Sequence, residues 1–319
     1  MKLLVMAWFA AGAVTTGAAE ASGPLQPPAA AVTAVTNASL EFQQLEANDD
    51  AAQVEIDKWK RDNAEAHSQG GGISDAELDA RIQTRVEPIQ KAYRAFLAKY
   101  PEHAGAHLAY GCFLNERQDE TGARQEWERA LELDPRNAAI YNNLAGSYSE
   151  GGPAKKAFDY FNKAIELKPS EATYYHNFGT TLYVLRKSGM SYYGVDEQGV
   201  YARIVQLYSN AVRLEPKNFP FAVDLAQTYY SLKPLPYDAA LNVWTNALQA
   251  AKNENEREEV YVHLARVKML SGNLAQARAL LNVVTNDSHG LLKTNLMRAI
   301  ESREGPQPQA PIAQPPTPH

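Results

Sequence analysis

One short phrase recurs along this chain at a regular spacing: ALELDP at residues 130–135, AIELKP at 164–169 and AVRLEP at 211–216. The prolines that end the first two copies are 34 residues apart, and the next step is 47. A fixed period of this length predicts an array of stacked units, because one unit alone cannot bury its apolar face. The 13 extra residues predict an insertion in the third unit.

Small and large residues keep fixed places within this period. Units aligned on the proline begin at residues 104, 138, 172, 219 and 258. Their eighth position is always small: Gly111, Ala145, Gly179, Ala226 and Ala265. Two antiparallel helices approach closely only where a small residue lies at their crossing, and large residues one turn away fill the remaining space. The pattern therefore predicts five helical hairpins.

Residues 104–171 are two uninterrupted units, AGAHLAYGCFLNERQDETGARQEWERALELDPRN and AAIYNNLAGSYSEGGPAKKAFDYFNKAIELKPSE. They resemble the tetratricopeptide repeat family, and the resemblance continues with insertions to about residue 285. It implies an all-α fold, a right-handed α-solenoid of stacked antiparallel helix pairs. The repeats then span residues 104–287, and a C-terminal helix over 288–304 caps them.

The repeat pattern weakens at its edges and at single positions. Pro101 lies 34 residues before Pro135, which indicates a degenerate leading unit over residues 73–103. His107 and Ala222 stand where the family usually has a large aromatic residue, and Lys268 takes an apolar position in the fifth unit. Because the family is defined by core positions, the resemblance indicates a fold more strongly than a function.

The first 21 residues have the features of a secretory signal. Lys2 precedes an apolar stretch from Leu3 to Val14, and small residues allow cleavage after Ala19 or Ala21. We therefore expect an exported protein, periplasmic or secreted; an uncleaved N-terminal anchor is the alternative. Residues 22–36 are rich in Ala, Pro and Thr without an apolar period, and predict a flexible linker.

An amphipathic helix is predicted over residues 37–72. Its apolar residues share one face: Phe42, Leu45, Ala52, Ile56 and Trp59. This helix either caps the leading unit or pairs between chains as a short coiled-coil seam.

Two signals mark the leading unit that follows. Ser74 and Glu77 form a capping box, which predicts a new helix start. Pro88 lies inside that helical region, where a proline removes a backbone donor, so we expect a kink or a helix–helix turn there.

The insertion covers residues 188–203 and carries Tyr192, Tyr193 and Tyr201. It is predicted to lie in a turn and to lengthen the second helix, with Asp196 as its N-cap. Its tyrosines either contact a partner or pack the longer helix onto the next unit. A catalytic site in this segment is a further alternative, although it contains no nucleophile–base pair.

In the tetratricopeptide repeat family the first helix of each unit lines a concave groove. The resemblance places polar and aromatic residues there: Asn142, Asn143, His176, Asn177, Thr180, Tyr183, Gln227, Tyr230, His263 and Arg266. Tyrosine and asparagine side chains offer contact area, donors and acceptors that suit an extended peptide. The set does not match the Lys/Asn/Arg clamp with which some family members hold a C-terminal carboxylate.

The sequence contains none of the common motifs of catalytic, phosphate-binding or metal sites that we searched for. There is no GxSxG, phosphate-binding GK loop, HExxH or CxxC. His103 and His107 are four residues apart but have no third ligand close in sequence, and Cys112 has no basic activator nearby. We therefore predict no catalytic residue, no metal site and no cofactor.

Composition and charge argue against two further classes of protein, nucleic-acid-binding proteins and membrane-spanning proteins. A net charge of −6 argues against nucleic-acid binding, and no apolar run after the signal is long enough to span a membrane. Residues 305–319 are rich in proline and predict a disordered tail. The sequence thus predicts a non-catalytic scaffold that binds a protein or peptide; self-assembly through residues 37–72 is the second hypothesis.

Overall fold

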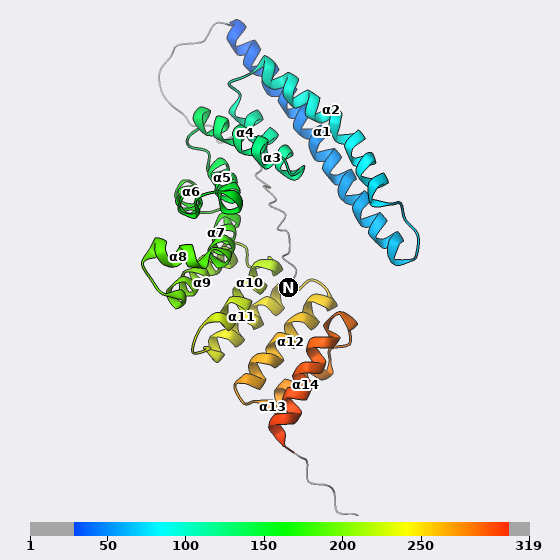
Figure 1. Cartoon of the computed structure of the whole chain (residues 1–319), viewed down its shortest axis with the longest axis vertical. Helices are drawn as coiled ribbons and strands as arrows, with labels where there is room; N and C mark the ends of the chain where they lie inside the picture. The colour runs from blue at the N-terminus through cyan, green and yellow to red at the C-terminus, as the bar shows by residue number, and fades with distance from the viewer. Residues whose placement is uncertain (1–28, 306–319) are drawn as a thin grey trace, which may run out of the picture. The chain divides into compact units, whose positions relative to one another are not determined.

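The computed structural model describes residues 29–305, and every regular element among them is a helix (Figure 1). These residues form two compact units, of which one ends at Lys168 and the other begins at Pro169. The predicted all-α class is confirmed. The expected signal over residues 1–21 and the tail after Gly305 lie outside the described residues.

The first unit consists of three consecutive helix pairs. Its helices are α1 (Ala29–Ser68), α2 (Asp75–Lys99), α3 (Ala104–Glu116), α4 (Glu120–Leu133), α5 (Ala138–Gly151) and α6 (Ala154–Leu167). Helix α1 packs on α2, α3 on α4 and α5 on α6, and each pair also contacts the next.

The second unit also stacks helix pairs and ends in one further helix. Its elements are α7 (Ala172–Val184), α8 (Arg186–Tyr193), α9 (Glu197–Leu214), α10 (Phe219–Thr228), the short 3₁₀ turn η1 (Tyr229–Ser231), α11 (Tyr237–Ala250), α12 (Glu254–Leu270), α13 (Leu274–Asn282), the 3₁₀ turn η2 (Asp287–His289) and α14 (Gly290–Glu304). The pairs are α7 with α9, α10 with α11 and α12 with α13, and α14 packs on α13 and α12.

The paired helices cross where the sequence places its smallest residues. A Cβ atom added to Gly111 would lie 2.5 Å from the ring of Trp127, and one added to Gly179 would lie 2.7 Å from the ring of Tyr208. The small residue of the unit thus receives the large residue of the second helix, as the repeat pattern predicts. Ala145 at the equivalent position of α5 is completely buried.

The helix α2 corrects one expectation. Residues 75–99 form a single helix that passes through Pro88, so the alternative of a helix–helix turn at Pro88 is wrong, and the degenerate leading unit predicted over residues 73–103 contains one helix. Pro88 is exposed, so water can satisfy the carbonyl that its missing N–H leaves without a partner. The capping box of Ser74 and Glu77 is present at the start of this helix.

Helix α1 forms a hairpin with α2 and buries its apolar stripe there. Phe42, Leu45, Ala52 and Ile56 belong to the core of the first unit. Tyr93 of α2 donates a hydrogen bond to Asp49 Oδ2 over 2.7 Å, at the place where polar residues interrupt the stripe. Because this stripe is covered within the chain, the structure favours a cap over a seam between chains.

The start of α1 corrects a second expectation. The helix begins at Ala29, so residues 29–36 are helical and the predicted linker over residues 22–36 is wrong for this part. These residues lack an apolar period, but they are rich in alanine, which has the highest intrinsic helix propensity.

The insertion forms α8 and the first turns of α9. Gly194 ends α8 with a φ of 64°, which favours glycine, and Asp196 Oδ1 accepts the backbone N–H of Gly199 over 2.8 Å. The prediction of Asp196 as N-cap of a lengthened second helix is confirmed.

We predict that Gly111→Ala lowers the free energy of unfolding by about 1–3 kcal/mol, because the added methyl group collides with the buried Trp127 ring. Gly290→Ala in α14 is the matched control. Its Cβ would meet nothing within 4 Å, so it should stabilise by about 0.4–1 kcal/mol. Urea denaturation followed by circular dichroism measures both. Equal effects of the two substitutions would contradict the close crossing.

Candidate partner-binding surface

The first helices of the second unit carry eight of the ten residues that the sequence assigns to the groove. We call the side of α7, α10, η1 and α12 that bears them the first-helix face. It is made by His176, Asn177, Thr180, Tyr183, Asp224, Gln227, Tyr230, Glu259, His263 and Arg266. Asp224 and Glu259 are further charged members of this face.

The two remaining candidates, Asn142 and Asn143, lie in α5 of the first unit and are buried. Asn142 Nδ2 donates to Asn143 Oδ1 over 3.3 Å, and Asn143 Nδ2 donates to Cys112 Sγ over 3.2 Å. Burial raises the pKa of the Cys112 thiol to about 12, so the thiol stays protonated at neutral pH. These side chains hold α3 and α5 together.

His176 joins α7 to α10. Its Nε2 lies 2.7 Å from Asp224 Oδ2, and its ring stacks on Phe221 with centroids 4.4 Å apart. The imidazole is mostly buried, whereas the Asp224 side chain is 39% exposed. The pair therefore fixes the relative position of the two helices and leaves part of the carboxylate on the surface.

Thr180 is also committed to an internal bond. It is buried, and its Oγ1 lies 2.9 Å from the hydroxyl of Tyr208, the ring that fills the crossing at Gly179. Tyr183 and Gln227, in contrast, are exposed. The first-helix face thus combines internally bonded residues with others that are open to a partner.

A stack of side chains connects η1, α11 and α12. His263 lies parallel to the buried Trp244, with ring centroids 4.3 Å apart and an interplanar angle of 2°. Tyr230 donates its hydroxyl proton to the backbone carbonyl of His263 over 3.2 Å. The guanidinium carbon of Arg266 lies 4.4 Å from the centroid of the Tyr230 ring. This arrangement fixes Tyr230 and gives Arg266 an aromatic surface to lie on.

The position of His263 sets its protonation state. Burial lowers its pKa to about 4, and electrostatic interactions with Arg266 and His289 contribute to the same shift. His263 is therefore neutral at pH 7, and it acts as a flat aromatic spacer between Trp244 and the surface.

The insertion borders the first-helix face at the end of α7. The ring of Tyr201 lies 5.9 Å from that of the exposed Tyr183, and Arg203 lies over the ring of Tyr193 at 4.0 Å. Gln198 accepts a hydrogen bond from the backbone N–H of Lys233 over 2.8 Å and so holds the segment before α11.

The acidic residues of the insertion are used structurally. Asp196 caps α9, and Glu197 Oε1 lies 3.0 Å from Arg186 Nε. Among the described residues, neither carboxylate is hydrogen-bonded to a nucleophilic side chain.

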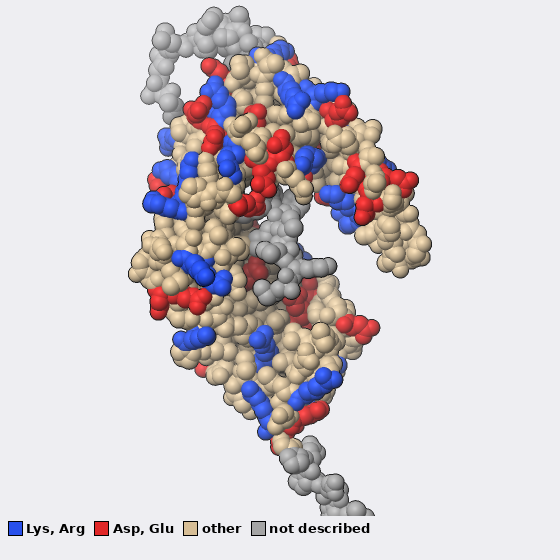
Figure 2. Space-filling model, viewed as in Figure 1, with Lys and Arg blue, Asp and Glu red and all other residues tan. Residues whose placement is uncertain are grey.

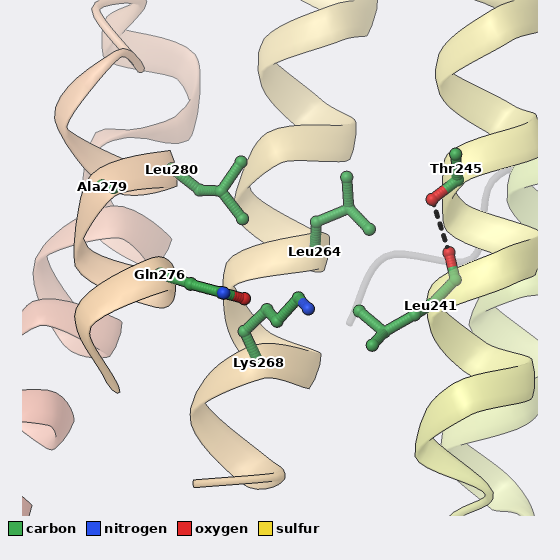
Figure 3. Close-up of a pocket in the computed structure, with 7 residues that line it drawn as sticks. All are labelled: Leu241, Thr245, Leu264, Lys268, Gln276, Ala279 and Leu280. Carbon is green, nitrogen blue, oxygen red and sulfur yellow. Dashed lines mark hydrogen bonds between the residues drawn. The ribbon is translucent and has the colours of Figure 1, made fainter. Parts of the chain in front are cut away.

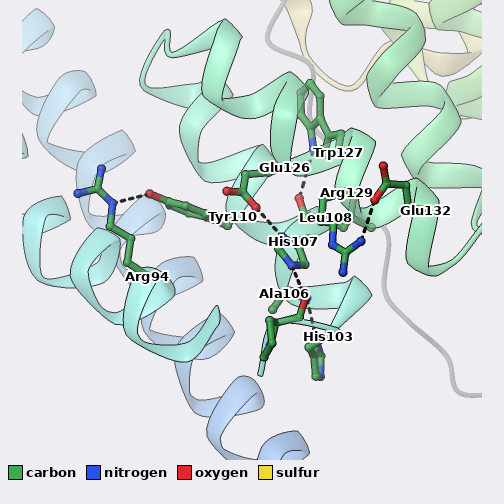
Figure 4. A network of polar contacts seen from close by, with 11 residues as sticks. Arg94, His103, Ala106, His107, Leu108, Tyr110, Glu126, Trp127, Arg129 and Glu132 are labelled. Carbon is green, nitrogen blue, oxygen red and sulfur yellow. Dashed lines mark hydrogen bonds and ion pairs between the residues drawn. The ribbon is translucent and has the colours of Figure 1, made fainter. Parts of the chain in front are cut away.

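The histidines that stand four residues apart have structural partners as well (Figure 4). His103 Nδ1 caps α3 by accepting the N–H of Ala106 over 3.0 Å. His107 lies in the core of its helix pair, with Nδ1 2.6 Å from Glu126 Oε2 and Nε2 3.0 Å from the carbonyl of Pro101. Within the described residues, no group of three or more His, Cys, Asp or Glu side chains is placed to bind a metal ion.

A shallow pocket of about 390 Å³ lies across α11, α12 and α13, and sequence reasoning missed it (Figure 3). Leu241, Leu264 and Leu280 line it, together with Lys268. Lys268 stands at a position of the repeat where the family has an apolar residue. This substitution is the sequence feature that could have indicated the pocket.

Charges of both signs alternate over the face of the molecule shown in Figure 2, without a continuous basic stripe among its described residues. This distribution matches the net charge of −6 and does not suit the tracking of phosphates. None of the described helices combines the length and the apolar character needed to cross a bilayer.

Residues 138–171 match the tetratricopeptide repeat family. Among curated proteins, human protein O-mannosyl-transferase TMTC3 is 31% identical over 98 residues, which is 30% of this chain and 11% of that protein. The peroxisomal targeting signal receptor of Komagataella phaffii is 26% identical over 184 residues, 53% of this chain and 30% of the receptor. The chain thus spans at most 30% of the length of these relatives.

Solved structures show the same fold. YrrB, described as a TPR protein with an unusual peptide-binding site, is similar with a TM-score of 0.52 at 16% identity, over 66% of this chain and 99% of YrrB. Pseudomonas aeruginosa pilF is similar with a TM-score of 0.52 at 18% identity, over 80% of this chain and 100% of pilF. Residues 138–171 are therefore a tetratricopeptide repeat, and the helix pairs have the tetratricopeptide repeat fold.

We predict that the stability of the second unit falls as pH drops from 6.5 to about 4. The pKa of His263 is lower in the folded chain than the 6.5 of the free side chain, so the unfolded chain binds more protons in this window. The stabilisation is complete above pH 6.5, and its loss towards pH 4 is on the order of 3 kcal/mol. Urea denaturation at a series of pH values measures it.

His263→Phe is the control, because phenylalanine keeps the ring stacked on Trp244 but cannot bind a proton. The difference between wild type and variant isolates His263 from the carboxylates that titrate in the same range. A difference that stays constant from pH 7 to pH 4 would contradict the burial of a neutral imidazole.

Proposed function

We propose that this chain, in which residues 138–171 match the tetratricopeptide repeat family, is a non-catalytic scaffold that binds a protein or peptide partner. The first-helix face of the second unit is the proposed binding surface. The partner meets Tyr183, Gln227 and Arg266, while the residues of the face that are bonded to one another hold these three in place.

One observation carries this proposal: the exposed residues stand on a framework of internal bonds. His176 with Asp224 and Tyr230 with His263 connect neighbouring first helices without help from a ligand. Tyrosine and arginine supply much of the binding energy in known interfaces. A surface that is already ordered loses little conformational entropy when a partner binds.

The comparisons support binding rather than catalysis. The Komagataella phaffii relative, which matches over 184 residues, is named a receptor for a targeting signal. The matches to O-mannosyl-transferases cover only 11% to 12% of those proteins. These partial matches therefore give no reason to assign a catalytic function to this chain.

Self-assembly through the N-terminal helix is the weaker hypothesis. Its apolar stripe is buried against α2, and within residues 37–68, the part of α1 whose side chains are described, the large apolar side chains that remain exposed are Leu40 and Val54. Two isolated residues do not form a continuous seam for a second chain.

The proposed compartment is outside the cytoplasm. Residues 1–21 supply the reason, since a short apolar stretch after Lys2 and before small residues is typical of a secretory signal. The single cysteine allows no internal disulfide, so packing must stabilise the chain in that compartment.

We predict that a photo-crosslinking amino acid at Gln227 captures a partner in the producing cells. Gln206 on α9 is the matched control, because it is an exposed glutamine on a second helix of the same unit. We expect an adduct band from position 227 that weakens at least about fivefold when Tyr183→Ala is added, because one aromatic contact is worth about 1 kcal/mol or more. Adducts of equal strength from both positions would contradict the assignment of the face.

We predict that residues 1–36 export a fused alkaline phosphatase, which becomes active only in an oxidising compartment. Val5→Arg should abolish this activity, because a charge in the apolar stretch prevents recognition of a signal. Mass spectrometry of the exported full chain should find an N-terminus at Glu20 or Ser22. Equal activity of the Val5→Arg fusion would argue against a signal in this segment.

A further inference from the structure

Helix α12 carries two opposite charges that have no partner. Glu259 and Arg266 make no hydrogen bond or ion pair with any residue in the part of the chain that the structure describes, and both are partly buried. They are seven residues apart, which is nearly two helical turns, so both lie on the same side of α12 about 10.5 Å apart along its axis. His263, which contacts Tyr230, lies between them on this side.

Arg266 is held ready for a carboxylate. Its guanidinium lies over the Tyr230 ring, and the Tyr230 hydroxyl is anchored on the His263 carbonyl. Stacking of this kind holds the guanidinium plane and leaves its N–H groups unpaired. A planar guanidinium with unpaired donors matches the two oxygens of a carboxylate.

Glu259 has no ion-pair partner among the described residues, and two other carboxylates act on it. Burial raises its pKa, and the carboxylates of Glu256 and Asp224 add to the rise, although His289 acts against it. Asp224 itself is paired with His176. An ammonium or guanidinium group from a partner would therefore offset both the burial of Glu259 and its repulsion by these carboxylates.

We infer that the second unit recognises an extended segment that presents an acidic side chain to Arg266 and a basic side chain to Glu259. This inference rests on the proposed binding function of the first-helix face and specifies its ligand. In a polyproline II segment, residues i and i+3 lie on the same side about 9 Å apart, close to the separation of the two charges on α12. In a β-strand, residues three apart point to opposite sides. The ligand is thus an acid-x-x-base segment, in either chain direction.

The test is a selection from a displayed library of random dodecapeptides on the full-length chain. Peptides enriched on the wild type should carry Asp or Glu three positions from Lys or Arg. They should bind the double variant Glu259→Lys/Arg266→Glu at least about tenfold more weakly, because two unlike contacts become like-charge contacts. The double variant, which keeps the net charge, should itself enrich the opposite order of charges.

The matched control exchanges a second pair on the same helix. Arg257 Nη2 lies 2.8 Å from Glu254 Oε2, so Glu254→Arg/Arg257→Glu keeps both the ion pair and the net charge. Its affinity for the enriched peptides should equal that of the wild type.

Three outcomes overturn the inference: enriched peptides without the spaced charges, a spacing of seven residues that indicates a helical ligand, or equal affinity for wild type and the Glu259→Lys/Arg266→Glu variant. Tyr183→Ala/Gln227→Ala separates these failures from a failure of the proposed function. If this variant weakens binding and the charge exchange does not, only the charge recognition is wrong. If neither variant weakens binding, the first-helix face is not the site.

Discussion

The close crossing of two helices at a glycine or an alanine is the constraint on which the rest of this structure depends. In the second unit the ring of Tyr208 fills the space that Gly179 leaves open, and its hydroxyl reaches Thr180 on the same helix. One residue therefore sets both the distance and the rotation of α7 against α9. Once the first helix of a pair is fixed in this way, its polar side chains meet those of the next first helix at defined positions, as His176 meets Asp224.

Much of this architecture can be predicted from the sequence because the repeat is carried by residue size. Small residues at the eighth position of each unit define the crossings, and α3, α5, α7 and α10 begin at the residues where the alignment places new units. The N-terminal hairpin is harder to predict, because its signals are of other kinds. Alanine propensity extends α1 back to Ala29 without an apolar period, and Pro88 is tolerated because it faces solvent.

The candidate site is less predictable than the fold. Position within the repeat indicates which side chains lie on a first helix, but not which of them are already bonded. Asn143 is hydrogen-bonded to Cys112, which lies 31 residues earlier in the chain. Thr180 is hydrogen-bonded to Tyr208, which lies 28 residues later. These partners come from other helices, so no local pattern reveals them. The unpaired state of Arg266 is likewise visible only when the surrounding helices are in place.

Amide hydrogen exchange of the full chain, with and without a bound peptide, tests the central claim most directly, namely that the first helices of the second unit form the binding surface. We expect slower exchange in α7, α10 and α12 and unchanged exchange in α9, α11 and the α1–α2 hairpin. Slower exchange confined to the hairpin, or to the helices around the pocket of Leu241 and Leu280, would contradict it.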